Sequence, residues 1–427
     1  MKHASIQAEY ARIQKANPGQ VNLKHMIDRD TYFVIGQTID KNVRYANLSL
    51  AVVAYSSKFK PHERVDTMYF SGAGTHFGLN LPEGDYQLLV FADRNKNQIF
   101  EQTEVIGQKS ISLNKTTSPD KVLDRIKIQL SPTNKVDWVE AISKPNLAEQ
   151  QQSLFFPSGT IRSLDEPLFS ENISTLGMYD PASFMEKAPT MFYALEEDLE
   201  FKIPVIFVHG IGGSIRDFEP IVNQIDRERY KPWFFYYPSG GDLNQLAELF
   251  HRIFLSRKVI KLGEMPMIII AHSMGGLVVR EALNKYDNGS KENNISLLVT
   301  IATPFDGHPA AASGEKHGLI VLPSWRDLNP ESQFIKELFR KSLPKTIEHQ
   351  LLYAYDNPAT LKISKNSDGV VPLSSQLRLN AQQQATGQLG FESSHTGILE
   401  NEEMIDHILE RMDQVKNFYP ESHLEVL

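Results

Sequence analysis

The chain has 427 residues, 44 basic and 52 acidic side chains, a formal net charge of −8 and no cysteine. This length exceeds one ordinary domain, so we expect two. The acidic balance lacks the basic footprint of a nucleic-acid binder, and the lack of cysteine excludes disulfides, thiolate metal sites and a cysteine nucleophile. No apolar run reaches the roughly 18 residues that span a bilayer, so no transmembrane segment is expected.

The start of the chain allows two locations. Residues Met1 to Gln7 hold no apolar signal core, which suits a cytoplasmic protein. Alternatively, Met1–His3 replaces a removed signal segment, and the protein is then periplasmic or associated with the cell envelope. The sequence leaves both readings open, because a chain without cysteine suits either redox environment.

The N-terminal third predicts an extension followed by a small β-sandwich. Within residues 1–30 we expect one helix, Ser5–Lys15, which ends at Asn17-Pro18-Gly19. From 31 to 130, short β-branched or alternating runs are separated by turn signals, a spacing typical of a sandwich. We expect this domain to dock on a membrane surface or a partner, or to present substrate. Its expected strands are Thr31–Gly36, Leu48–Tyr55, Tyr86–Phe91 and Ile126–Leu130.

Residues 131–146 predict a linker punctuated by Pro132 and Pro145, and residues 147–427 predict a second domain of the α/β class. In this domain apolar runs alternate with amphipathic segments, the pattern of a mostly parallel, doubly wound sheet with helices on both faces. The expected strands are Pro204–Val208, Trp233–Tyr237, Met267–Ile270, Leu297–Ile301 and Leu351–Tyr355, and the expected helices include Leu277–Leu283, Pro330–Arg340 and Asn401–Lys416.

The strongest chemical motif is Ala271-His-Ser-Met-Gly-Gly276, which follows a strand and precedes a helix. A tight turn at this junction would project the Ser273 hydroxyl from the carboxyl edge of the sheet, as in a nucleophile elbow. Small residues must flank the serine because the strand and helix backbones nearly touch. Gly275 fits this need, whereas Ala271 stands where glycine is usual. An ordinary strand-to-helix loop is the alternative, since serine and small residues are common.

A second motif, His209-Gly-Ile-Gly-Gly213, follows the strand Pro204–Val208. An acyl-transfer enzyme needs two N–H donors aimed at the developing oxyanion. One is expected from Met274, directly after the nucleophile, and the other from this loop, where Ile211 is the natural candidate. A glycine-rich turn without a role is the alternative. The residues expected to support the elbow and the loop are His209, Gly210, Gly212, His272 and Gly275.

The acid and the base are expected late in the chain. Asp368 lies in Ser367-Asp-Gly-Val-Val-Pro372, downstream of the strand Leu351–Tyr355, and the apolar segment after it would anchor it. Asp356 competes because it directly follows that strand, although it also suits a turn before Asn357-Pro358. His395 stands on a loop before the last helix, which completes the order Ser, Asp, His that this elbow fold uses.

With these motifs, residues from about Ile203 to the C-terminus resemble bacterial lipases and esterases of the α/β-hydrolase superfamily. The loop at His209 and the elbow look like those of small bacterial lipases that also carry alanine at the first elbow position. The segments Ala302-Thr-Pro-Phe-Asp-Gly307 and Ser367–Pro372 are similar to those of the glycosylphosphatidylinositol inositol deacylase group. The N-terminal domain has only a loose likeness to small sandwiches appended to envelope proteins. The resemblance implies catalytic Ser273, Asp368 and His395, with an oxyanion hole at Ile211 and Met274.

We therefore expect a serine hydrolase that cleaves carboxylic, lipid-like esters through an acyl-enzyme and requires no cofactor. An acyltransferase would use the same residues, with an alcohol or amine in place of water. A binding protein that keeps the fold without turnover is a third reading, because fold alone does not imply function.

The segment 305–340 is a candidate lid. It leaves the sheet at the edge where this fold places its active site, and insertions of this length are commonly lids or binding elements. Within its apolar stretch Gly318–Trp325, the residues Leu319, Ile320 and Trp325 would contact an alkyl chain and exclude water. Packing of this stretch on the core is the alternative.

The N-terminal domain also contains a candidate calcium loop. Five polar side chains match the ligand spacing of a twelve-residue loop, with Ile99 at the backbone-carbonyl position. Gln98 stands where such loops carry glycine, and the flanks read as strands, so a polar hairpin turn is the alternative. The candidate ligands for a structural Ca²⁺ are Asp93, Asn95, Asn97, Glu101 and Glu104.

Overall fold

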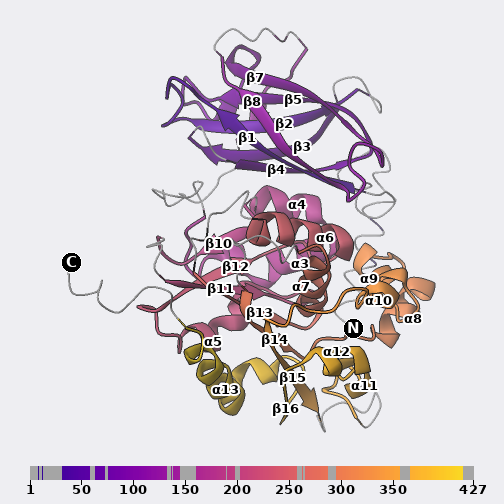
Figure 1. The fold of residues 1–427 in the computed structure, drawn as a ribbon. Helices are drawn as coiled ribbons and strands as arrows, with labels where there is room; N and C mark the ends of the chain where they lie inside the picture. The colour runs from indigo at the N-terminus through magenta and orange to yellow at the C-terminus, as the bar shows by residue number, and fades with distance from the viewer. Residues whose placement is uncertain are drawn as a thin grey trace, which may run out of the picture. The chain divides into compact units, whose positions relative to one another are not determined.

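In the computed structural model, the chain forms two compact units (Figure 1). The first contains residues 1–162 and 175–191, and the second contains 163–174 and 192–427. The expected helix Ser5–Lys15 lies outside the described residues, apart from Ala8 and Arg12. The structure describes Ala8, Arg12 and residues 31–57, 63–72, 76–131, 136, 138–144, 160–188, 190–197, 202–256, 262, 265–286, 295–355 and 366–416.

The first unit is built from two sheets that share an apolar core. One has the order β4–β1–β8, in which β1 is antiparallel to β4 and parallel to β8. The other is antiparallel with the order β3–β2–β5–β7. Side chains of both sheets, such as Val34 and Val52, are buried in one cluster. The strands are β1 (Thr31–Ile39), β2 (Ser49–Ser56), β3 (Glu63–Ser71), β4 (His76–Pro82), β5 (Gly84–Ala92), β7 (Val105–Leu113) and β8 (Val122–Gln129), and helix α4 (Pro181–Lys187) contacts β3 and β4.

Part of the expected linker packs on this unit instead of leaving it. Val136, Val139 and Ile142 join a second apolar cluster with Val53 and Phe91, on the opposite face of the four-stranded sheet. These apolar side chains therefore belong to the first unit, which contains residues 1–162. The short strands β6 (Ile99–Phe100) and β9 (Ile142–Ser143) pair there.

The candidate calcium loop connects β5 to β7 as a hydrogen-bonded turn. The two carboxylate oxygens of Asp93 accept from the backbone amides of Asn97 and Gln98, each at 3.1 Å. Glu104 accepts from the Arg94 amide at 2.7 Å. In the part of the chain that the structure describes, no group of three or more His, Cys, Asp or Glu side chains could hold a metal ion. Calcium binding stays a prediction.

The second unit has a seven-stranded sheet, which confirms the expected α/β class. Its order is β10–β12–β11–β13–β14–β15–β16, and every pair is parallel except β10 with β12. All five expected strands are present, whereas β10 and β16 were not anticipated. The strands are β10 (Phe192–Ala194), β11 (Ile203–Val208), β12 (Tyr230–Phe235), β13 (Met267–His272), β14 (Ile295–Ile301), β15 (Glu348–Tyr355) and β16 (Gly387–Glu392).

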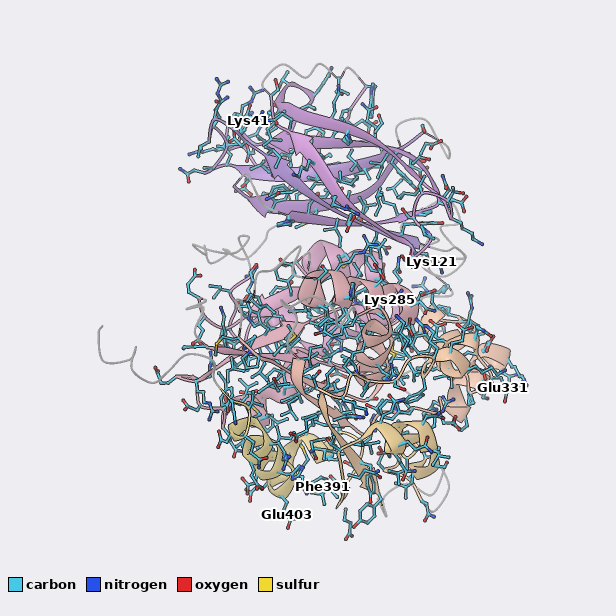
Figure 2. All side chains as sticks on the ribbon, in the orientation of Figure 1. Lys41, Lys121, Lys285, Glu331, Phe391 and Glu403 are labelled. Atoms are coloured by element: carbon cyan, nitrogen blue, oxygen red, sulfur yellow. The ribbon has the colours of Figure 1, made fainter. Side chains whose placement is uncertain are left out.

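Helices cover both faces of this sheet, with α6 and α7 on one face and α5 and α13 on the other (Figure 1). Charged side chains on outer helices and turns, such as Glu331 and Glu403, point to solvent (Figure 2). None of the described helices is long and apolar enough to cross a membrane. The helices of this unit, in chain order, are α5 (Glu219–Val222), α6 (Leu243–Phe250), α7 (Met274–Asn284), α8 (Pro309–His317), α9 (Pro323–Leu328), α10 (Gln333–Glu337), α11 (Leu373–Gln376), α12 (Leu379–Gln384) and α13 (Glu402–Asp413), while α3 (Glu171–Tyr179) lies where the chain passes between units.

Candidate active site

Ser273 occupies a sharp turn between β13 and α7. Its φ of 54° and ψ of −130° lie in a region that serine rarely adopts, which is the strained backbone of a nucleophile elbow. A side chain on Gly275 would place its Cβ 2.4 Å from the Val208 carbonyl oxygen, so only glycine lets α7 approach the end of β11 this closely. The turn therefore presents the Ser273 hydroxyl at the carboxyl edge of the sheet.

The structure brings together the three side chains that follow one another along the chain in the order Ser273, Asp368, His395. The Nε2 atom of His395 lies 2.9 Å from Ser273 Oγ, and its Nδ1 atom lies 2.6 Å from Asp368 Oδ2. An ionised carboxylate only accepts, so Nδ1 carries the proton and Nε2 offers its lone pair to the serine hydroxyl. The competing acid, Asp356, lies outside the described residues.

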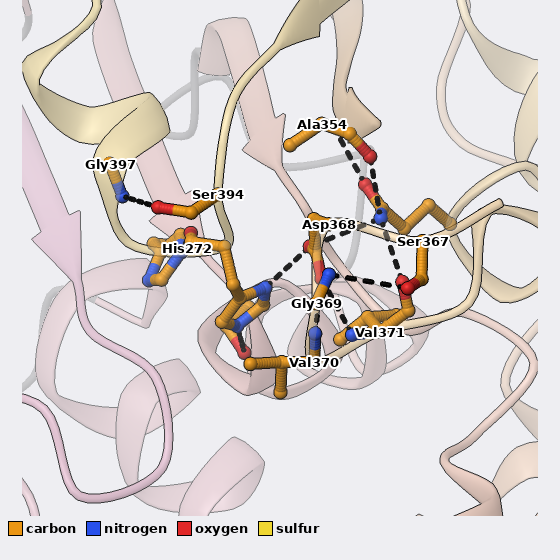
Figure 3. Close-up of polar contacts among 12 residues, drawn as sticks. His272, Ala354, Ser367, Asp368, Gly369, Val370, Val371, Ser394 and Gly397 are labelled. Atoms are coloured by element: carbon orange, nitrogen blue, oxygen red, sulfur yellow. Dashed lines mark hydrogen bonds and ion pairs between the residues drawn. The ribbon is translucent and has the colours of Figure 1, made fainter. Parts of the chain in front are cut away.

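Four donors surround the Asp368 carboxylate, which has no exposed surface. Its Oδ1 atom accepts from the amides of Val370 at 2.9 Å and Val371 at 2.7 Å. Its Oδ2 atom accepts from His395 and also from Nε2 of Gln376 at 3.1 Å (Figure 3). Sequence reasoning missed Gln376, because no motif or spacing links it to the acid.

The backbone of His395 is held from two sides. Its amide donates to the Asp368 carbonyl at 3.0 Å, and its carbonyl accepts from Nε2 of His272 at 2.8 Å. Burial lowers the pKa of His272 to about 3, so this ring is neutral and its Nε2–H is the donor. His272, the residue before Ser273, thus contacts the loop that carries His395, a more specific contact than the expected support of the elbow.

Hydrogen bonding in the loop after β11 leaves amides free next to Ser273. Gly212 donates to Ser239 Oγ at 2.9 Å, and Gly213 donates to the Gly210 carbonyl at 3.1 Å. Among the described residues, no acceptor is found for the amides of Gly210, Ile211 or Met274. Gly210 and Met274 are buried, whereas Ile211 is partly exposed. Buried amides are normally paired, so unpaired ones beside a serine suit binding of an oxyanion.

His209 supports this loop through contacts with Tyr237 and with the Gly210 carbonyl. Its ring stacks on Tyr237 with centroids 4.3 Å apart, and its Nδ1 atom lies 2.8 Å from the Gly210 carbonyl oxygen. The Tyr237 hydroxyl donates to the His209 carbonyl at 2.6 Å. Burial lowers the pKa of His209 to about 4, which keeps the ring neutral. The segment directly after β12 therefore fixes the loop on which Ile211 lies.

The site lies at the point where the strand order of the sheet reverses. Strand β11 is flanked by β12 on one side and β13 on the other, so the chain leaves these strands toward opposite sides. Ligands of open α/β sheets bind in the crevice at such a switch point. Here the loop after β11 and the elbow after β13 lie side by side, because a Cβ on Gly210 would lie 2.8 Å from Ser273 Cβ. The second unit belongs to the α/β-hydrolase fold.

Comparison with known proteins gives one partial family match and several distant structural likenesses. A family profile described as lecithin:cholesterol acyltransferase matches residues 243–353, a stretch that includes the elbow. No curated protein matches the chain. Similar solved structures include a gene product from Listeria innocua, at 17% identity over 51% of this chain and 96% of that one with a TM-score of 0.37. Others are a Bacillus licheniformis lipase in its mature form (17%, 52%, 97% and 0.37) and a Legionella pneumophila phospholipase (19%, 41%, 45% and 0.33).

The candidate lid forms three short helices, α8 to α10, between β14 and β15. Leu319 is 68% exposed, whereas Ile320 is buried and the Trp325 ring packs against Gly314 and Gly318. The expected helix Pro330–Arg340 is shortened to α10. His308 joins the insertion to the acid loop, because its Nδ1 accepts from the Ala310 amide at 3.0 Å and its Nε2 donates to the Val370 carbonyl at 2.5 Å. A lid role stays a prediction, carried now by Leu319.

Three fully buried histidines of the hydrolase unit should make its stability depend on pH. Burial lowers the pKa of His349 to about 3, as it does for His209 and His272, whereas unfolded histidine titrates near about 6.5. Their stabilising contribution is therefore complete above pH ~6.5 and is lost as pH falls toward 4. Urea unfolding at stepped pH should show a slope of up to about 4 kcal/mol per pH unit from these three groups.

Carboxylates titrate in the same pH range as these histidines. A variant is therefore needed to isolate the contribution of a single histidine to the pH dependence. His349 contacts Thr300 Oγ1 within the sheet at 2.9 Å and lies outside the Ser273 contacts. In the pH range between the folded and the unfolded pKa of His349, the His349→Gln variant should take up one proton fewer on unfolding than the wild type. An unchanged uptake would show that this histidine is not buried in its neutral form.

Proposed function

We propose that the hydrolase unit cleaves carboxylic esters through an acyl-enzyme on Ser273. The observation that carries this proposal is the continuous contact from Ser273 Oγ through His395 to Asp368, at 2.9 and 2.6 Å. A serine is a poor nucleophile unless a base removes its proton. Here the base is already aligned, and only 5% of Ser273 and 9% of His395 is exposed, so little water competes.

The proposed reaction has two steps. His395 Nε2 takes the Ser273 proton while Oγ attacks the ester carbonyl carbon, and Asp368 stabilises the imidazolium. The oxyanion accepts from the Ile211 and Met274 amides. His395 then gives its proton to the leaving alkoxide oxygen, which departs as the alcohol. Water repeats the sequence on the acyl-enzyme, which releases the acid and restores Ser273.

A lipid-like ester is the proposed substrate, and acyl transfer is the second candidate. Support for both comes from the match of residues 243–353 to the lecithin:cholesterol acyltransferase family, whose name states acyl transfer between lipids. Both reactions share the same acyl-enzyme, so the triad does not separate them. They differ only in whether water or an alcohol accepts the acyl group.

A fluorophosphonate probe tests the proposal directly. The probe reacts with an activated serine, so we expect labelling that peptide mapping assigns to Ser273. The same protein is then given acetyl to hexadecanoyl esters, first in water and then with a long-chain alcohol present. Free acid as the main product indicates hydrolysis, and a new ester indicates transfer. A protein that neither labels nor turns over any ester is a binding protein on a hydrolase fold.

Leu319 provides a prediction about chain length. An exposed leucine on the insertion would contact an alkyl chain, and losing that contact removes about 1 kcal/mol of binding. Leu319→Ser should therefore lower kcat/KM for octanoyl esters about fivefold and leave acetyl esters unchanged. Leu379→Ser is the matched control, because Leu379 is 65% exposed but lies on α12. Equal losses on both esters, or a wild-type preference for acetyl, would contradict a lipid-binding lid.

A further inference from the structure

Gln376, the last residue of α11, has an amide group that is fully engaged. Its side chain is 1% exposed. The Oε1 atom accepts from the Ala354 amide at 3.0 Å. The Nε2 atom lies within donating distance of the carbonyls of Ala354 at 3.0 Å and Val371 at 3.2 Å, and of Asp368 Oδ2 at 3.1 Å. One side chain thus contacts a strand, the acid loop and the acid itself.

The contact with Ala354 replaces a missing strand partner. Strand β14 pairs with β15 only as far as Ile301 opposite Leu352, and its next amide, from Ala302, donates to the Leu352 carbonyl. Two residues further along β15, Ala354 turns its amide and carbonyl to the same side. The Gln376 amide meets both groups there, as a neighbouring strand would. Gln376 is therefore anchored to the sheet at Ala354 as well as to the acid loop at Val371.

The contact with Asp368 falls on the oxygen that faces the base. Asp368 Oδ2 accepts from both His395 Nδ1 and Gln376 Nε2, while the two loop amides occupy Oδ1. These four donors point at the lone-pair sites of the carboxylate and fix the orientation of both its oxygens. Without Gln376, Oδ2 would lose one of these two donors, and the hydrogen bonds that link the acid loop to Ala354 of β15 through this side chain would be lost.

We propose that Gln376 is a positioning residue that keeps the Asp368 carboxylate aimed at His395. This inference rests on the proposed function, because it assigns Gln376 to the same site. Gln376 does not contact the substrate itself in this proposal, and it affects the reaction only through Asp368 and His395. A purely structural role, capping β15 at Ala354, would affect folding but not the His395–Asp368 contact in the folded protein.

Two variants separate these roles. Gln376→Met keeps the length of the side chain but removes its donors and acceptor, and we expect kcat to fall about tenfold to a hundredfold with KM for a short ester little changed, as for loss of one hydrogen bond to a charged group. Gln376→Glu donates to Asp368 only while the new carboxyl is protonated. Its activity relative to wild type should therefore rise as pH falls. Gln350→Met is the control, because Gln350 is a buried amide of β15 that contacts Glu348 and His407 instead.

The readouts distinguish failure of this inference from failure of the proposed function. The downfield proton resonance of the His395 Nδ1–H···Asp368 bond reports the contact without any turnover, and we expect Gln376→Met to weaken or shift it. A wild type without labelling or hydrolysis overturns the proposed function, and the resonance still tests Gln376. A folded Gln376→Met with wild-type kcat and resonance overturns the inference. If that variant does not fold, a pH-independent activity ratio for Gln376→Glu overturns it equally.

Discussion

Replacing Ser273 with alanine should lower ester hydrolysis by about a millionfold, to the level that binding and the oxyanion donors alone provide. The change removes one hydroxyl, whose contact is His395 Nε2 at 2.9 Å. The serine is 5% exposed and alanine fits the same turn, so the melting temperature should change little. Initial rates with a nitrophenyl ester and a thermal melt measure both effects on one preparation.

A second buried serine provides the control for this substitution. Ser118 is 2% exposed and belongs to the first unit, outside the hydrolase fold. Ser118→Ala should retain full activity and labelling. Hydrolysis by Ser273→Ala well above the uncatalysed rate would remove Ser273 as the nucleophile, and another serine mapped with the probe would replace it.

The elbow and the loop after β11 were predictable because their signals are local. Buried parallel strands appear as continuous apolar runs, and the residues that touch at the strand ends follow these runs directly. Gly275 illustrates this, since the short sequence around it already implies that α7 must approach β11. The sheet order was not given by any one run, but the alternation of strands and helices restricts it to a doubly wound arrangement.

Elements with weak apolar patterning were missed. Strand β16 contains Gly387, Gly390 and two exposed polar side chains, because it lies at the edge of the sheet and buries little. Strand β7 carries three consecutive exposed residues, Gln108 to Ser110, which interrupt its alternation. Val136 and Ile142 lie in a proline-punctuated stretch whose pattern predicts a linker, although they belong to an apolar cluster of the first unit.

Gln376 shows which part of a site local patterns cannot reveal. Its partners, Ala354 and Asp368, are 22 and 8 residues away in the sequence. Glutamine as a residue type carries no signal for this role in the sequence. The role follows only from the early end of β14 and the path of the acid loop. The same holds for His272, whose contact with the His395 carbonyl spans 123 residues.

Asp368→Asn should lower kcat by about 10⁴-fold while the protein stays folded. The Oδ1 position is fixed by donors from Val370 and Val371, so the asparagine carbonyl must take that side. Its NH₂ group then faces His395 Nδ1, at the place where Oδ2 accepts a proton now. The imidazole can keep a hydrogen bond only by moving its proton to Nε2, and it then presents N–H rather than a lone pair to Ser273. Single-turnover acylation, followed by burst kinetics with a nitrophenyl ester, measures this loss directly.

The competing acid decides how this result is interpreted. Asp356→Asn should reduce kcat far less than Asp368→Asn, because the observed contacts of His395 are with Asp368 in both its side chain and its backbone. The introduced NH₂ also faces the Nε2 donor of Gln376, so inverting the amide to relieve this contact would oppose the two loop amides instead. The tautomer defect should therefore persist at every pH at which the protein is folded. A larger loss for Asp356→Asn, or full activity of Asp368→Asn at any pH, would transfer the role of the acid away from Asp368.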